Sequence, residues 1–155
     1  MAKITPFLWF DDNLEEAMNF YVSIFKNSKI VSVQRMGNVG PGKGTVVTAT
    51  FELDGQRYMG LQGGPRFKFT EAVSMFVDCE SQEEVDYFWE KLTAGGSESR
   101  CGWLKDKFGL SWQIVPRELG RWLGDKDPVK AKRAMEAMLK MQKIDVAEVR
   151  RASEG

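Results

Sequence analysis

The residues best suited to do chemistry lie in the segment from Cys101 to Pro116, which predicts a strand, a turn around Phe108–Gly109 and a second strand. The second strand carries the side chain of Gln113 on one face. A glutamine amide offers a hydrogen-bond donor and an acceptor, but its carbonyl oxygen is a poor ligand for Zn²⁺ or Fe²⁺. The chain contains no histidine. Cys101 therefore lacks the imidazole that a Cys–His nucleophile needs, and we expect it to be structural.

Strand alternation predicts that further aromatic, hydroxyl and amide side chains face a common interior. Rings would supply flat apolar walls, and amides and hydroxyls would supply a few directed hydrogen bonds, which is the usual composition of a small-ligand site. The alternative interpretation is that large side chains only fill the concave face of a curved sheet. The candidate ligand-binding residues are Phe7, Trp9, Thr50, Glu52, Tyr58, Gln62, Ser74, Phe76, Trp103 and Gln113.

Two other features invite a chemical interpretation. Glu52 is the one carboxylate expected inside, so it is a candidate general base. The segment Gly63-Gly64-Pro65-Arg66 could present backbone amides and a guanidinium to an anion. We interpret that segment first as a linker between two modules, where glycine and proline are expected.

Bulk composition excludes several classes of function. The chain has 155 residues, enough for one domain or two small fused halves. Its 22 basic and 22 acidic residues give no net charge, which argues against a nucleic-acid partner. The sequence has no apolar run of membrane-spanning length and no signal-peptide pattern. With only Cys79 and Cys101, we expect free thiols in a cytoplasmic protein.

The predicted elements repeat. The first half predicts strand, helix and three strands, with Asp11-Asp12-Asn13 as the helix cap and a hairpin turn at Asp54–Gly55. The second half repeats the start of this order, with Ser81 and Glu84 as a capping box. The helix sequences Glu15–Tyr21 and Glu83–Trp89 match by residue type at an offset of 68. The predicted ranges of the first seven elements are 4–10, 14–25, 30–36, 45–53, 56–62, 72–79 and 83–92.

The chain changes character after Pro116. Residues 117–123 predict one or two helical turns, Asp127–Pro128 predicts the start of a helix, and residues 145–153 predict a last short helix. Methionines recur along one face of the longer helix, at Met135, Met138 and Met141. We expect them to pack this tail onto its own domain or onto a partner subunit.

A duplicated strand–helix–three-strand module ending in Asp-x-x-Gly-x-x-x-[Glu/Gln] resembles the vicinal oxygen chelate superfamily, which includes glyoxalase I, bleomycin-resistance proteins and extradiol dioxygenases. Several segments look like its PhnB-like branch, often labelled demethylubiquinone methyltransferase-like. They are Thr5–Phe10, Leu61–Pro65, Asp86–Leu92, Cys101–Pro116 and Met135–Asp145.

The resemblance implies four positions that bind a metal in other members, and these fall on Thr5, Gly60, Ala72 and Gln113. Such residues suit Zn²⁺ or Fe²⁺ poorly, so we expect no metal. The label implies a methyltransferase, but no glycine-rich loop of the kind that usually holds an adenosyl cofactor joins a predicted strand to a helix. We therefore expect no cofactor.

Together these arguments predict an α+β fold of two tandem βαβββ modules whose curved mixed sheets surround a cleft, with a helical C-terminal extension. The expected boundaries are 1–62 for the first module, 63–69 for the linker, 70–116 for the second module and 117–155 for the extension, in one compact domain. The resemblance also implies a homodimer.

Our first functional hypothesis is metal-independent binding of a small, partly aromatic organic molecule in the cleft. The second is a metal-independent transferase, lyase or isomerase that uses Gln113, Tyr58 and Glu52. The third is a dimeric interaction scaffold without catalysis.

Overall fold

The computed structural model describes residues 2–37 and 44–155, so most of the glycine- and proline-rich stretch 37–44 lies outside the described residues. The chain divides into two compact units, Met1–Phe69 and Thr70–Gly155. In the part of the chain that is described, no helix is both long and apolar enough to cross a membrane.

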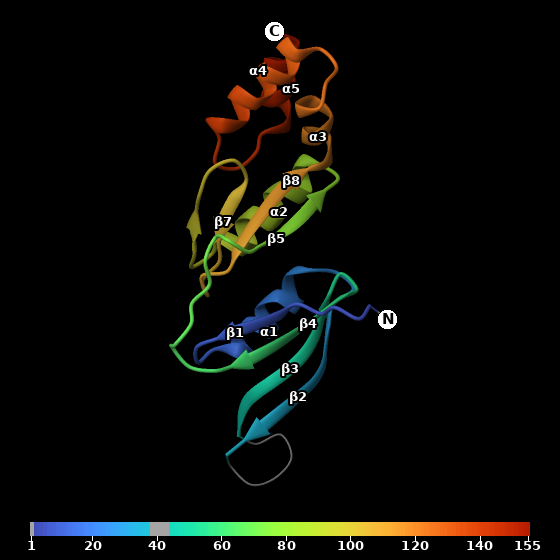
Figure 1. Ribbon diagram of the computed structural model, residues 1–155. Helices are drawn as coiled ribbons and strands as arrows, with labels where there is room; N and C mark the ends of the chain where they lie inside the picture. The colour runs from blue at the N-terminus through green and yellow to red at the C-terminus, as the bar shows by residue number, and fades with distance from the viewer. Residues whose placement is uncertain (1, 38–43) are drawn as a thin grey trace. The chain divides into compact units, whose positions relative to one another are not determined.

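The first unit is a four-stranded mixed sheet with one helix on it (Figure 1). Its strands follow the spatial order β1-β4-β3-β2, in which β1 and β4 run parallel and the other neighbours antiparallel. Helix α1 buries an apolar stripe at helical spacing that includes Leu14, Met18 and Tyr21. The elements are β1 (Phe7–Phe10), α1 (Leu14–Ile24), β2 (Lys29–Met36), β3 (Thr45–Leu53) and β4 (Gln56–Gln62).

The second unit repeats this topology. Its sheet has the order β5-β8-β7-β6, in which β5 and β8 run parallel, as β1 and β4 do in the first unit. Helices α1 and α2 begin at Leu14 and Gln82, the offset at which their sequences match. The predicted duplication of the α+β module is therefore confirmed. The elements are β5 (Ser74–Cys79), α2 (Gln82–Thr93), β6 (Ser97–Glu98), β7 (Trp103–Lys105) and β8 (Ser111–Pro116).

Three helices follow β8 and gather at one end of the second unit (Figure 1). They are α3 (Arg117–Leu123), α4 (Pro128–Leu139) and α5 (Val146–Glu154). The Asp127 side chain accepts a hydrogen bond from the amide of Val129, and Pro128 occupies the first turn, as the sequence predicts.

This C-terminal extension is part of the core of its own unit. Leu119, Ala134, Met141, Ile144 and Val149 form a buried cluster with Val115 of β8 at its margin. Backbone bonds add to the docking, because the amide nitrogens of Cys101 and Gly102 donate to the carbonyls of Met141 and Gln142. The methionine prediction holds for Met141 and, in part, for Met138, whereas Met135 is 41% exposed.

The turn between β7 and β8 is organised by the carboxylate of Asp106. The side chain is 3% exposed, and its Oδ1 accepts from the backbone amides of Phe108 at 2.8 Å and Leu110 at 3.1 Å. Its Oδ2 accepts from the indole nitrogen of Trp112 at 2.9 Å. Gly109 has φ +88°, a conformation that favours glycine. The Asp-x-x-Gly motif thus fixes the entry into β8.

We expect Ile144→Ala to lower the free energy of unfolding by about 3 kcal/mol, because it opens a cavity in the cluster that holds the extension. Ile144 is fully buried, whereas Val129 on α4 is 54% exposed. The matched control Val129→Ala should therefore change stability by less than about 0.5 kcal/mol. Urea unfolding followed by tryptophan fluorescence measures both. Equal effects of the two substitutions would contradict the docking of the extension.

Asp106→Asn should destabilise the protein by about 2 kcal/mol. The asparagine has only one acceptor oxygen, so its NH₂ group must face either the Trp112 indole N–H or the turn amides, which are also donors. Asp12 is exposed and serves as the matched control in Asp12→Asn. The same unfolding experiment compares the two. If Asp106→Asn left the free energy of unfolding unchanged, the turn would not need the charge of the carboxylate.

Candidate functional site

In the second unit, the sheet face turned away from α2 brings several candidate residues together. Trp103 of β7 pairs with Gln113 of β8, which pairs with Phe76 of β5, so the three side chains lie side by side across adjacent strands. We call this set the aromatic row. Phe76 is 60% exposed, and the amide of Gln113 donates to the Ser74 hydroxyl at 3.0 Å. Four predicted residues thus share one face.

The neighbouring positions on this face form a second row of polar residues. Ser97 of β6 pairs with Lys105 of β7, which pairs with Ser111 of β8, and Ser111 pairs with Ser74 of β5. We call this set the polar row. Lys105 makes an ion pair with Glu71, 2.7 Å between Nζ and Oε1. Hydrogen bonding and the nearby ammonium charge lower the pKa of Glu71, so its carboxylate is ionised at neutral pH.

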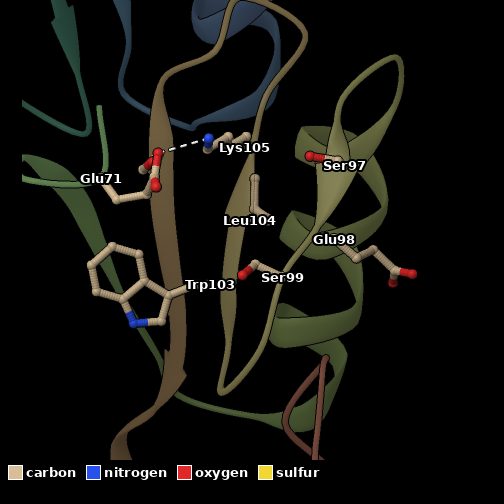
Figure 2. A pocket seen from close by; sticks show the side chains of 8 residues that line it. Glu71, Ser97, Glu98, Ser99, Trp103, Leu104 and Lys105 are labelled. Atoms are coloured by element: carbon tan, nitrogen blue, oxygen red, sulfur yellow. Dashed lines mark ion pairs between the residues drawn. The ribbon is translucent and has the colours of Figure 1, made fainter. Parts of the chain in front are cut away.

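A pocket of about 240 Å³ opens where the polar row meets Trp103. Figure 2 shows Glu71 and Lys105 pointing toward each other, whereas Glu98 points away from them. Glu98 instead accepts a hydrogen bond from the Trp89 indole at 2.5 Å. The lining residues are Glu71, Ser97, Glu98, Ser99, Trp103, Leu104, Lys105 and Ser111.

The hydroxyl of Ser111 is buried in the wall of this pocket. Its residue is 0% exposed, and the oxygen has no hydrogen-bond partner among the described residues. Buried polar atoms normally find partners, because an unmet hydroxyl costs desolvation energy. Ser111 is thus a polar group that a bound molecule or a water could satisfy.

Sequence reasoning missed Glu71, Ser97, Ser99 and Lys105 as site residues. The β7–β8 turn pairs Lys105 with Ser111, and this pairing could have been predicted by counting residues across the turn. Glu71 precedes β5, and its approach to Lys105 depends on how the chain enters that strand, for which the sequence offered no signal.

The first unit also has a sheet face turned away from its helix. Phe7 and Trp9 pair with Met59 and Leu61 of β4, and Thr50 and Glu52 lie on the same face. The segment after β4 packs against this face: Trp9 donates its indole N–H to the Gly64 carbonyl at 2.9 Å, and Phe67 meets its ring edge-on at 4.9 Å. Glu52 pairs with Arg57 at 3.4 Å.

The predicted orientation of Tyr58 and Gln62 is wrong. A two-residue turn makes Leu53 pair with Gln56, so Glu52 pairs with Arg57 and Phe51 with Tyr58. Even-numbered residues of β3 therefore share a face with odd-numbered residues of β4. Tyr58 lies on the α1 side, stacked on Phe51 with 5.6 Å between ring centres, and burial raises its pKa. Tyr58 and Glu52 point to opposite faces.

Gln62 has a structural contact on the α1 side. Its Oε1 accepts the amide N–H of Leu14, the first residue of α1, at 3.2 Å. The Asn13 side chain makes no capping hydrogen bond with any described residue. The predicted cap from Asp11-Asp12-Asn13 is thus replaced by a glutamine from the neighbouring strand. Ser81 does cap α2, accepting from the Glu84 amide at 3.2 Å.

The thiol of Cys79 does not have the surroundings of a nucleophile. Cys79 and Cys101 are free thiols, and burial together with the charges of Glu84 and Asp78 raises the pKa of Cys79 to about 12. Within residues 2–37 and 44–155, no three His, Cys, Asp or Glu side chains lie close enough together to hold a metal ion.

Comparison with known proteins identifies relatives. The profile of the 3-demethylubiquinone-9 3-methyltransferase family matches residues 2–115, so α3–α5 lie beyond the match. A PhnB protein of Bacillus cereus, described as a 3-demethylubiquinone-9 3-methyltransferase, is 44% identical with a TM-score of 0.68. The alignment covers 74% of this chain and 99% of that one. None of the curated proteins matches the sequence.

Two more distant structures share the fold. PA1353 of Pseudomonas aeruginosa is 18% identical with a TM-score of 0.62, over 75% of this chain and 98% of that one. The fosfomycin resistance protein FosX of Listeria monocytogenes is 16% identical with a TM-score of 0.53, over 75% and 93%. PhnB, PA1353 and FosX belong to the vicinal oxygen chelate superfamily. The chain belongs to the PhnB-like family that carries the 3-demethylubiquinone-9 3-methyltransferase label, within this glyoxalase and bleomycin-resistance superfamily.

Proposed function

We propose that this protein binds a small, partly aromatic organic molecule without a metal, on the sheet face of the second unit that carries the aromatic row. The observation that supports the proposal is the row itself: an exposed Phe76 and the indole of Trp103 on either side of the Gln113 amide. An apolar surface with one directed polar group in its middle suits a ring that carries a hydrogen-bonding substituent.

Strand geometry sets the size of the ligand. Phe76 and Trp103 sit on the two strands that flank β8, so their Cα atoms lie roughly 10 Å apart. A single ring or a small fused ring system spans that distance. The pocket of 240 Å³ lies just below the range of about 300–1,000 Å³ typical of sites for drug-sized molecules. The fit therefore favours a ligand with one ring.

The residues present do not fit the metal that other superfamily members bind, such as the Mn(II) in one FosX structure. The corresponding positions hold a threonine, a glycine, an alanine and Gln113. Gly60 and Ala72 offer no side-chain donor, and the Gln113 amide is bonded to Ser74. Borderline divalent ions prefer imidazole, thiolate or carboxylate ligands. The donor set supports binding without a metal.

The residues also do not fit a cofactor held by a glycine-rich strand-to-helix loop. The connection from β1 to α1 is Asp11-Asp12-Asn13, and that from β5 to α2 is Glu80-Ser81. Both are acidic and lack glycine, so we derive no methyl transfer from the family label. The enzyme hypothesis also loses support, since Tyr58 and Glu52 lie on opposite faces of one sheet.

Phe76→Ala and Trp103→Ala should each weaken binding of single-ring aromatic probes about tenfold, because each removes a stacking surface. Phe76 is 60% exposed, so its removal should leave stability nearly unchanged. Phe67→Ala is the matched control, since Phe67 is a 55% exposed phenylalanine in the other unit. Titration with benzamide and phenylacetamide by amide NMR measures affinity. Binding that disappears with EDTA, or that depends on Phe67 instead, would refute the proposal.

Gln113→Leu should weaken binding of the same amides roughly tenfold, since it removes the hydrogen-bonding group between the two rings. Tyr58→Phe should leave their affinity unchanged, because Tyr58 lies on the α1 side of the other sheet. The NMR titrations compare the two variants. A larger loss for Tyr58→Phe would place the ligand elsewhere.

A further inference from the structure

We propose that the ligand carries a carboxylate, which binds to Lys105 and Ser111 while its ring lies on Trp103. This inference rests on the proposed function and names the ligand class for the same site. It starts from the Ser111 hydroxyl, which is fully buried, lines the pocket and has no partner among the described residues. A buried hydroxyl without a partner costs the fold stability until a ligand or a water meets it.

The second step concerns charge. Lys105 is directly opposite Ser111 in the β7–β8 pairing, and both residues line the pocket, so it offers an ammonium and a hydroxyl, both hydrogen-bond donors. Ser97 adds another hydroxyl in the same row. A carboxylate offers two acceptor oxygens and accepts charge-assisted hydrogen bonds from such donors. An amide or an alcohol offers fewer acceptors and no charge.

The third step concerns competition from Glu71. The Glu71 carboxylate pairs with the Lys105 ammonium, so a carboxylate can reach this ammonium. The Glu71 side chain is 63% exposed and that of Lys105 is 44% exposed, so their pair is weakened by water. An incoming acid can replace Glu71, which then turns into solvent. Glu98 does not compete, because it is bonded to Trp89.

The fourth step concerns spacing. The polar row and the aromatic row are two residues apart along each strand, which is about 7 Å. In benzoate and phenylacetate, the distance from the carboxyl group to the middle of the ring is shorter than this, and the flexible four-carbon stem of Lys105 covers the difference. Such an acid can therefore hold its carboxylate at Lys105 and lay its ring on Trp103, toward Gln113.

The test titrates benzoate and phenylacetate against benzamide and phenylacetamide by amide NMR, with inorganic phosphate as an anion without a ring. We expect the acids to bind at least tenfold tighter than the amides. Lys105→Met should abolish that preference, so that the acids and the amides bind with similar affinity. Lys91→Met is the matched control, because Lys91 is an exposed lysine in the last turn of α2.

Two further variants should move acid binding in opposite directions. Glu71→Gln removes the competing carboxylate and should tighten acid binding severalfold. Ser111→Ala should weaken acid binding about tenfold without lowering Tm, since the hydroxyl it removes has no partner among the described residues. If Ser111→Ala lowered Tm, the hydroxyl would stabilise the fold itself, and this result would count against the inference.

The outcomes separate the inference from the proposed function. If acids and amides bind alike and both depend on Phe76, the carboxylate inference is wrong and the aromatic site stands. If phosphate binds as tightly as the aromatic acids, the site is for a bare anion and the inference is wrong. If none of the aromatic probes perturbs the amides of β5, β7 and β8, both the inference and the proposed function fail.

Discussion

The second unit depends on the buried carboxylate of Asp106. By accepting two turn amides and the Trp112 indole, it fixes the position at which β8 begins. That position sets the pairing of β8 with both neighbours, and a slip of one residue would turn Ser111 and Gln113 toward α2. One anion in the turn therefore decides which side chains face the pocket. The Asp-x-x-Gly motif thus positions the first residues of β8, and it does so independently of which side chains β8 carries.

The same topology is used in two ways. In the first unit, the segment after β4 lies against Trp9, and a Cβ placed on Gly63 would come within 2.4 Å of the indole ring. In the second unit, the corresponding face keeps an exposed phenylalanine, an amide and a pocket. Duplication supplies two faces with the same topology, and among the described residues it is the second that holds a buried hydroxyl without a partner, that of Ser111.

Much of the fold was predictable because it follows from local signals. Apolar periodicity located α1 and α2, the Asp54–Gly55 pair located the β3–β4 hairpin, and Asp127–Pro128 located α4. The site was harder, since it depends on register. Counting across the two-residue turn places Tyr58 beside Phe51, yet alternation along β4 alone does not reveal that. The orientation of Gln62 was predicted wrongly because it caps α1 from β4, and the sequence of α1 does not indicate a cap from a strand. Ser111 could be assigned to the face of Gln113, but only the structure shows that its hydroxyl lacks a partner among the described residues.

The backbone contact between the extension and residues 101–102 has a consequence for how the family diversifies. Trp103 follows directly after two amides that are tied to Met141 and Gln142, and Gly102 leaves no room for a Cβ beside the Ile114 carbonyl and Ile144. The wall of the pocket is thus braced by a segment that lies past the matched region 2–115. Substitutions in residues 141–144 would change how freely the Trp103 indole tilts, and with it the residence time of the ligand proposed above, without changing any side chain that lines the pocket.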